Sequence, residues 1–343
     1  MAVVKASSNT FLIVTLATAF SIALYVCPRR RRLTAKFTNN AQQKYEQQLV
    51  DEDESALLTS HTDYVMVNQH ELRIIEIPHH DRTVPLMVFI HGLGGQAAQW
   101  EHQLKHFSES YHVLAVDLVG CGYSEVVSDW SSYTASSLAE DVVQLITADD
   151  RYPVSRPLIM VGHSYGCSVA TFACASDWIK NRLVGLVMIS PKADLDKDQT
   201  KGQTFLPWIP DFMIENSRTK DRQGGLYSNS VERLLDADAT EELRKSQLRW
   251  NLMSRTDVYK RMATGASFPT PEIYDRLTGT NILLIGGQED KITPPSDMDI
   301  IKSRLPSMKS APHVIPGVGH MSLVAKPHVV NDLIDVFLNT LKK

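Results

Sequence analysis

Short apolar runs alternate with amphipathic segments along most of the chain. Eight of these runs have the length and the valine, isoleucine and leucine content of strands. They lie at residues 64–67, 72–77, 86–90, 113–116, 158–161, 183–189, 282–285 and 313–315. Segments with the apolar spacing of helices separate the later runs, for example 97–107, 135–146 and 330–341. Strand followed by helix, repeated, predicts an α/β fold in which helices cover both faces of a mostly parallel sheet.

Two stretches depart from this alternation. Residues 68–71 are polar and separate the first two runs, which predicts an antiparallel hairpin at the start of the sheet. Between about residues 194 and 273 no run resembles a core strand, and large apolar residues are scattered among charged ones. This stretch predicts a helical insertion of about 80 residues, which we interpret as a lid.

The first 61 residues differ in composition from the rest. Residues 11–27 are continuously apolar or small, roughly the shortest length that spans a bilayer, and four arginines follow at 29–32. Because the charge follows the apolar core, residues 1–33 predict an uncleaved anchor, with a signal peptide or mitochondrial presequence as alternatives. The positive-inside rule then predicts a cytosolic domain at the endoplasmic reticulum or mitochondrial outer membrane. Residues 34–61 are polar and predict a linker.

Composition excludes several classes of partner and cofactor. The net charge of -4 provides no basic field, so nucleic acid is not an expected partner. The four cysteines (Cys27, Cys121, Cys167 and Cys174) form no C-x-x-C pair and no cluster with histidine, which argues against a zinc site or a disulfide scaffold. We expect no metal and no organic cofactor, and the sequence does not indicate an oligomeric state.

A candidate nucleophile lies in the segment GHSYG, residues 162–166. The segment directly follows the run at 158–161 and precedes a helix-like stretch, which is the strand–turn–helix setting of a nucleophile elbow. The glycines let strand and helix approach closely and hold Ser164 in a strained, exposed turn. The alternative is an ordinary glycine-rich turn.

A serine nucleophile needs a base, and the base needs an acid that orients it. The loop GGQEDKITP at 286–294 follows one strand and carries Asp290, with Glu289 as the rival acid. The loop GVGHM at 317–321 follows the last strand and carries His320. Both loops are expected at the carboxyl edge of the sheet, where α/β folds collect their catalytic side chains. The alternatives are a turn carboxylate and a loop histidine without a role.

The segment HGLGG at residues 91–95 follows the run at 86–90 and can turn backbone N–H groups toward a substrate oxyanion. We expect the N–H groups of Leu93 and Tyr165 to be these donors. The spacing G-x-G-x-x-G is absent, so the loop does not predict dinucleotide binding.

Five segments in this order, HGLGG, DLVGCGYS (117–124), GHSYG, GGQEDKITP and GVGHM, resemble the α/β-hydrolase superfamily, and are most similar to its small abhydrolase-domain proteins with a serine nucleophile. The resemblance covers about residues 64–341 and implies an α/β-hydrolase domain at 62–343. In the family a hydrophobic residue and a proline follow the acid, which favours Asp290, ahead of Ile292 and Pro294, over Glu289.

Two departures limit what the resemblance implies. Epoxide hydrolases and haloalkane dehalogenases of the superfamily have an aspartate where this chain has Ser164. Lipid enzymes with H-x-x-x-x-D from the catalytic histidine are associated with acyl transfer, whereas Ala325 stands at that position here. The expected function is a serine esterase or lipase acting on an apolar or lipid-like acyl substrate. The alternatives are a non-catalytic binding or scaffold protein and a hydrolase of C–C or peptide bonds.

Overall fold

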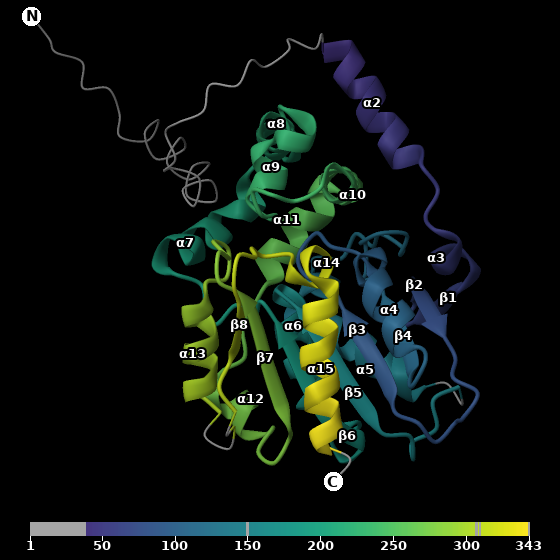
Figure 1. Cartoon of the computed structure of the whole chain (residues 1–343). Coiled ribbons are helices and arrows are strands. Elements are labelled where there is room, and N and C mark those ends of the chain that lie inside the picture. The colour runs from purple at the N-terminus through teal and green to yellow at the C-terminus, as the bar shows by residue number, and fades with distance from the viewer. Residues whose placement is uncertain (1–38, 149–150, 306–307, 309, 342–343) are drawn as a thin grey trace, which may run out of the picture.

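The computed structural model describes residues 39–148, 151–305, 308 and 310–341. These residues form an eight-stranded sheet in the order β1-β2-β4-β3-β5-β6-β7-β8 (Figure 1). The pairs β1/β2 and β2/β4 are antiparallel and all later pairs are parallel. The strands are β1 Thr62–Val67, β2 His70–Ile77, β3 Leu86–Ile90, β4 His112–Val116, β5 Leu158–His163, β6 Leu183–Ile189, β7 Ile282–Gly287 and β8 His313–Ile315. The predicted α/β architecture is confirmed.

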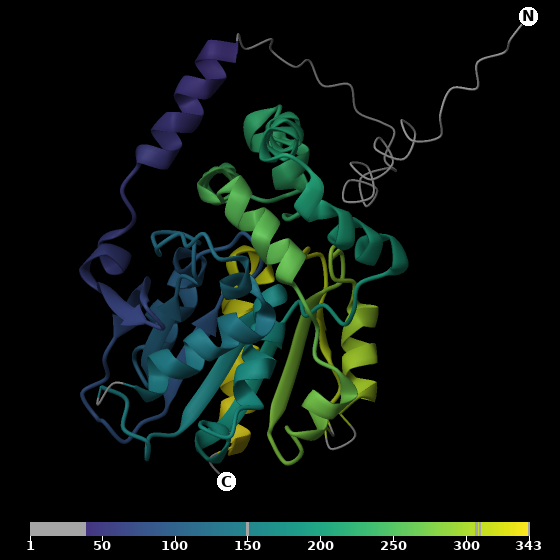
Figure 2. The same ribbon diagram turned by 180° about the vertical axis from the view of Figure 1, so that it is seen from behind.

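Helices cover both faces of the sheet. In Figure 1 α15 lies in front of the strands, and in the reverse view of Figure 2 the teal helices α5 and α6 lie in front of them. The helices outside the insertion are α2 Asn39–Asp51, α3 Ala56–Ser60, η2 Ala97–Trp100, α4 Glu101–Phe107, η3 Trp130–Tyr133, α5 Ala135–Thr147, α6 Tyr165–Cys174, η4 Lys180–Arg182, α13 Pro295–Ser303, α14 Ser322–Ala325 and α15 Pro327–Leu341.

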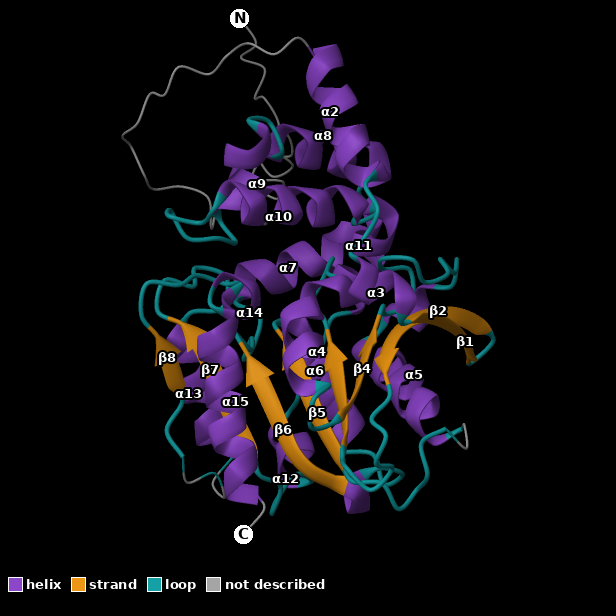
Figure 3. Cartoon of the chain, turned by 45° about the vertical axis from the view of Figure 1, so that its right-hand side comes forward, coloured by secondary structure: helices purple, strands orange, loops and turns teal. Residues whose placement is uncertain are grey.

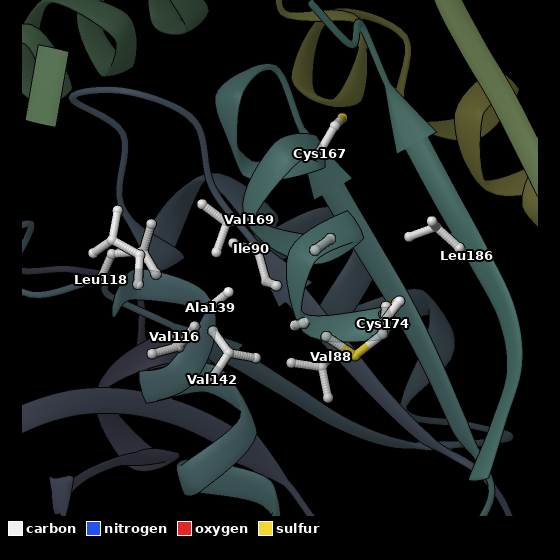
Figure 4. Close-up of a cluster of buried hydrophobic side chains, with 14 of the residues drawn as sticks. Val88, Ile90, Val116, Leu118, Ala139, Val142, Cys167, Val169, Cys174 and Leu186 are labelled. Atoms are coloured by element: carbon white, nitrogen blue, oxygen red, sulfur yellow. The ribbon is translucent and has the colours of Figure 1, made fainter. Parts of the chain in front are cut away.

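Alternate residues of the central strands supply two separate cores. In β3, which is buried on both faces, Val88 and Ile90 pack toward α5 and α6 (Figure 4), whereas Met87 and Phe89 pack toward α4 and α15. Strands buried on both faces are continuously apolar because neither face meets water. This is why the apolar runs of the sequence predict the strands well.

The predicted insertion is helical and joins β6 to β7. Its elements are α7 Lys197–Phe205, η5 Leu206–Trp208, α8 Asp211–Asp221, η6 Gly225–Tyr227, α9 Asn229–Glu232, α10 Glu241–Met253, α11 Thr256–Gly265 and α12 Pro271–Asp275. In Figure 3 most of these helices lie beyond the arrowheads of the strands, over the edge where the catalytic side chains of such sheets are found.

The segment expected to be a polar linker contains α2 and α3. Leu49 of α2 is 1% exposed, and the Nε of Arg249 in α10 donates a hydrogen bond of 2.9 Å to its carbonyl oxygen. Farther along, the guanidinium of Arg73 in β2 is buried between the carboxylates of Glu54 and Asp117. The described residues before β1, 39–61, are therefore attached to both the insertion and the sheet.

The predicted membrane localisation is corrected. In the part of the chain that the structure describes, no helix has the length and apolar character needed to cross a membrane. The longest helix there, α15, has 15 residues, whereas a span needs about 20. The predicted anchor, residues 1–33 with its apolar run at 11–27, lies outside the described residues. Nothing in the described part of the chain supports a single-pass anchor.

Candidate active site

Ser164 occupies a strained turn between β5 and α6. Its backbone has φ 53° and ψ -124°, a positive-φ conformation that costs a non-glycine residue on the order of 1–3 kcal/mol. Its N–H donates a 2.8 Å hydrogen bond to the carbonyl of Ile189 at the end of β6. The turn thus holds Ser164, which is partly exposed, at the carboxyl edge of the sheet.

Two glycines permit this turn. A Cβ at Gly166 would lie 2.3 Å from the carbonyl oxygen of Ile90, so only glycine lets α6 start this close to β3. A Cβ at Gly92 would lie 2.9 Å from the Cβ of Ser164. The HGLGG loop therefore lies directly against the serine.

The loops after β7 and β8 bring Asp290 and His320 together. The Nδ1 of His320 lies 2.8 Å from the Oδ2 of Asp290, and both residues are 4% exposed. The other carboxylate oxygen accepts hydrogen bonds of 2.9 Å from the N–H groups of Ile292 and Thr293. Burial raises the pKa of Asp290, but the charge and hydrogen bond of His320 and the donors of Thr293 outweigh it and lower the pKa to about 2.

The imidazole of His320 lies beside the residue that precedes Ser164. The rings of His163 and His320 are 4.8 Å apart, and His163 Nε2 donates a 3.0 Å hydrogen bond to the carbonyl of His320. Burial and the neighbouring His320 lower the pKa of His163 to about 3, so its ring is neutral. Among the described residues no hydrogen bond joins Ser164 Oγ to His320, and this link of the triad stays a prediction.

The two predicted oxyanion donors belong to the elbow and to the HGLGG loop that lies against it. Tyr165 is the first residue of α6, where a backbone N–H has no acceptor within the helix. Leu93 is at the tip of a turn closed by the bond from Gly95 N–H to Gly92 carbonyl. The buried His91 braces this loop, because Nδ1 donates to the Gly92 carbonyl at 2.8 Å and Nε2 accepts from Leu118 N–H at 3.0 Å. These roles of Leu93 and Tyr165 also stay predictions.

Comparison with known proteins agrees with this architecture. The family model of the alpha/beta hydrolase fold matches residues 85–327.

The chain belongs to the α/β-hydrolase fold family.

Among the relatives of this α/β-hydrolase, an abhydrolase domain-containing protein of Schizosaccharomyces pombe is 24% identical over 310 residues, covering 84% of this chain and 81% of that protein. Epoxide hydrolase 3 of Mus musculus is 24% identical over 303 residues, which cover 84% of this chain and 80% of that protein. A thermophilic esterase from Thermogutta terrifontis has a TM-score of 0.66 at 20% identity, covering 82% of this chain and 99% of that one, and shows the shared fold. The family supports a hydrolase of the α/β type.

Sequence analysis of this α/β-hydrolase missed two contacts around the His320 loop. Asp236 and Leu234, in the insertion, accept hydrogen bonds from the N–H groups of Gly319 and Met321. Nothing in the spacing of the sequence indicates these contacts, because the partners are about 80 residues apart. Among the described residues, no group of three potential ligands could hold a metal ion.

Wild type should have a larger free energy of unfolding than Asp290→Asn, and this difference should shrink by about 1 kcal/mol when the pH is lowered from 6 to 3. The pKa of Asp290 is lowered in the folded protein from 3.8 to about 2. Its stabilising contribution is therefore complete above pH 3.8 and is lost as the pH falls toward 2. Urea unfolding of wild type and Asp290→Asn at both pH values measures the difference; a difference that widens at pH 3 would contradict the assignment.

Proposed function

We propose that the protein is a serine hydrolase that cleaves carboxylic esters through Ser164, His320 and Asp290. The proposal rests on two observations: Ser164 is held at φ 53° in the elbow, and His320, whose ring lies 4.8 Å from that of the preceding His163, is paired at 2.8 Å with the buried carboxylate of Asp290. A nucleophile, a base and an orienting acid at one sheet edge are the groups that acyl transfer to water requires.

The reaction starts when Ser164 Oγ attacks the ester carbonyl and its proton passes to His320 Nε2. Asp290 accepts the Nδ1–H bond, which orients the ring and stabilises the imidazolium. The N–H groups of Leu93 and Tyr165 donate to the oxyanion of the tetrahedral intermediate. His320 returns the proton to the leaving alkoxide, and water then attacks the acyl-enzyme with His320 again as base. The products are an alcohol, a carboxylic acid and the free serine.

Apolar side chains of the insertion favour an apolar acyl group. A small cavity of about 10 Å³ beside the glycines of the HGLGG loop is lined by Trp250, Met253, Val258 and Tyr259, together with the polar Gln96, Ser254 and Arg255. The α10–α11 corner lies over this loop, because a Cβ at Gly94 would meet Ser254 Oγ at 2.9 Å. Aromatic and aliphatic walls bind hydrocarbon better than polar substrates.

Epoxide hydrolysis is the second candidate, because epoxide hydrolase 3 is among the relatives. The superfamily's epoxide hydrolases, however, carry an aspartate where this chain carries Ser164. A serine at the elbow suits acyl transfer rather than attack on an epoxide carbon.

Fluorophosphonate labelling of the purified protein tests the proposal. Wild-type protein should be labelled and should hydrolyse p-nitrophenyl esters, with a preference for longer acyl chains. The Ser164→Ala variant should show neither labelling nor hydrolysis. An epoxide substrate should not be turned over. Labelling that persists in Ser164→Ala, or wild-type protein without labelling and without esterase activity, would overturn the proposal.

A further inference from the structure

The loop that carries His320 is held on both sides of the histidine by the insertion. The N–H of Gly319 donates to the Oδ1 of Asp236, and the N–H of Met321 donates to the carbonyl oxygen of Leu234 at 3.1 Å. Both acceptors lie in the short connection between α9 and α10. The backbone before and after His320 therefore takes its position from the insertion.

The third support comes from the nucleophile elbow. His163, directly before Ser164, donates to the carbonyl oxygen of His320 at 3.0 Å. The histidine backbone is thus clamped between the nucleophile elbow and the insertion. If the bonds from the insertion are removed, His320 keeps the bond from His163 and its pairing with Asp290. If the bond from His163 is removed, it keeps the bonds of the insertion and the same pairing.

Asp236 is held in surroundings that disfavour a carboxylate. It is 9% exposed, and burial raises its pKa, as do the nearby charges of Asp238 and Glu289, while Gly319 N–H and Lys326 lower it. It lines a cavity of about 420 Å³ together with Glu101, Glu242 and Lys326, so two further carboxylates and one cation share this space. A buried carboxylate among like charges is costly, so its bond to Gly319 is a specific interaction rather than incidental packing.

We propose that Asp236 is a positioning residue for His320, acting through the backbone of Gly319. This inference rests on the proposed function, in which His320 is the base. The insertion then has a second role besides covering the site, because its α9–α10 connection fixes the position of the His320 ring relative to Ser164. Displacement of a catalytic group by about 1 Å can cost on the order of 100-fold in rate, so the expected loss falls in kcat and not in KM.

Asp236→Ala is expected to lower kcat on a p-nitrophenyl ester by about 10-fold to 100-fold, with KM changed less than about twofold. The rate of fluorophosphonate labelling should fall in parallel. Asp236→Asn retains an acceptor oxygen and should recover most of the activity. Glu232→Ala, which removes an exposed carboxylate at the end of α9, is the control and should behave as wild type. If the alanine variant does not fold, Asp236→Ser, whose hydroxyl is too short to reach Gly319, should show the same loss.

Hydrogen exchange gives a readout independent of turnover. The peptide covering residues 317–326 should exchange faster in Asp236→Ala than in wild type or Asp236→Asn. A folded alanine variant with wild-type kcat would overturn this proposal alone, as would an asparagine variant as slow as alanine. Wild-type protein that is neither labelled nor active would overturn the proposed function, and this inference with it.

Discussion

Replacing His320 with alanine is expected to lower kcat for ester hydrolysis by about a million-fold. A serine hydroxyl is a weak nucleophile at neutral pH, and in the proposed site His320 is the group that can take its proton. Asp290 cannot substitute for the base, because its carboxylate lies on the far side of the ring, bonded to Nδ1. Steady-state assays with a p-nitrophenyl ester measure the loss.

Two variants make this result specific. His328 is an exposed histidine of α15, so His328→Ala should retain wild-type activity. The double variant Ser164→Ala/His320→Ala should be no slower than either single variant, because the two residues act as one unit. If a folded His320→Ala protein kept more than about one hundredth of the wild-type kcat, His320 would not be the base.

Replacing Arg73 with methionine is expected to destabilise the protein by about 3–5 kcal/mol. Arg73 is 1% exposed and lies between Glu54 and Asp117, whose side chains are 4% and 0% exposed. Methionine fills much of the same space but removes the cation with which both buried carboxylates pair. A buried charge that has lost its partner destabilises the folded protein by far more than the intact pair stabilises it.

Urea unfolding of wild type and Arg73→Met measures this loss. The control is Arg276→Met, because Arg276 pairs with Asp177 at the surface, where both side chains are largely exposed. Surface pairs contribute about 0–1 kcal/mol, so this variant should unfold close to wild type. A loss below about 1 kcal/mol for Arg73→Met would mean that the two carboxylates are protonated or solvated without the arginine.

The elements of the fold were largely predictable because their signals are local. Central strands are buried on both faces, so continuous apolar runs identified them. The runs at 158–161 and 282–285 each ended two residues early, because β5 continues through Gly162 and His163, and β7 through Gly286 and Gly287. Glycine has a low strand propensity, yet here it lets neighbouring loops approach the strand ends.

The segment before β1 was harder to interpret. Its composition is polar, and only Leu49 and Leu58 among its described residues are buried apolar side chains. Two buried apolar residues are too few to produce the apolar periodicity of a helix, so the sequence of α2 and α3 resembles that of a linker. What orders them is docking on α10 and the ion pair with Arg73, which depend on residues far along the chain.

The sequence by itself determined the strands, the helical insertion and the loops that carry Ser164, Asp290 and His320. These follow from apolar periodicity, glycine spacing and chain order, each confined to a few neighbouring residues. Only the tertiary structure decided which side chains meet. The pairing of His320 with Asp290 spans 30 residues and the contact from Asp236 to Gly319 spans 83, and such contacts form because strand order and insertion packing bring distant loops to one edge of the sheet.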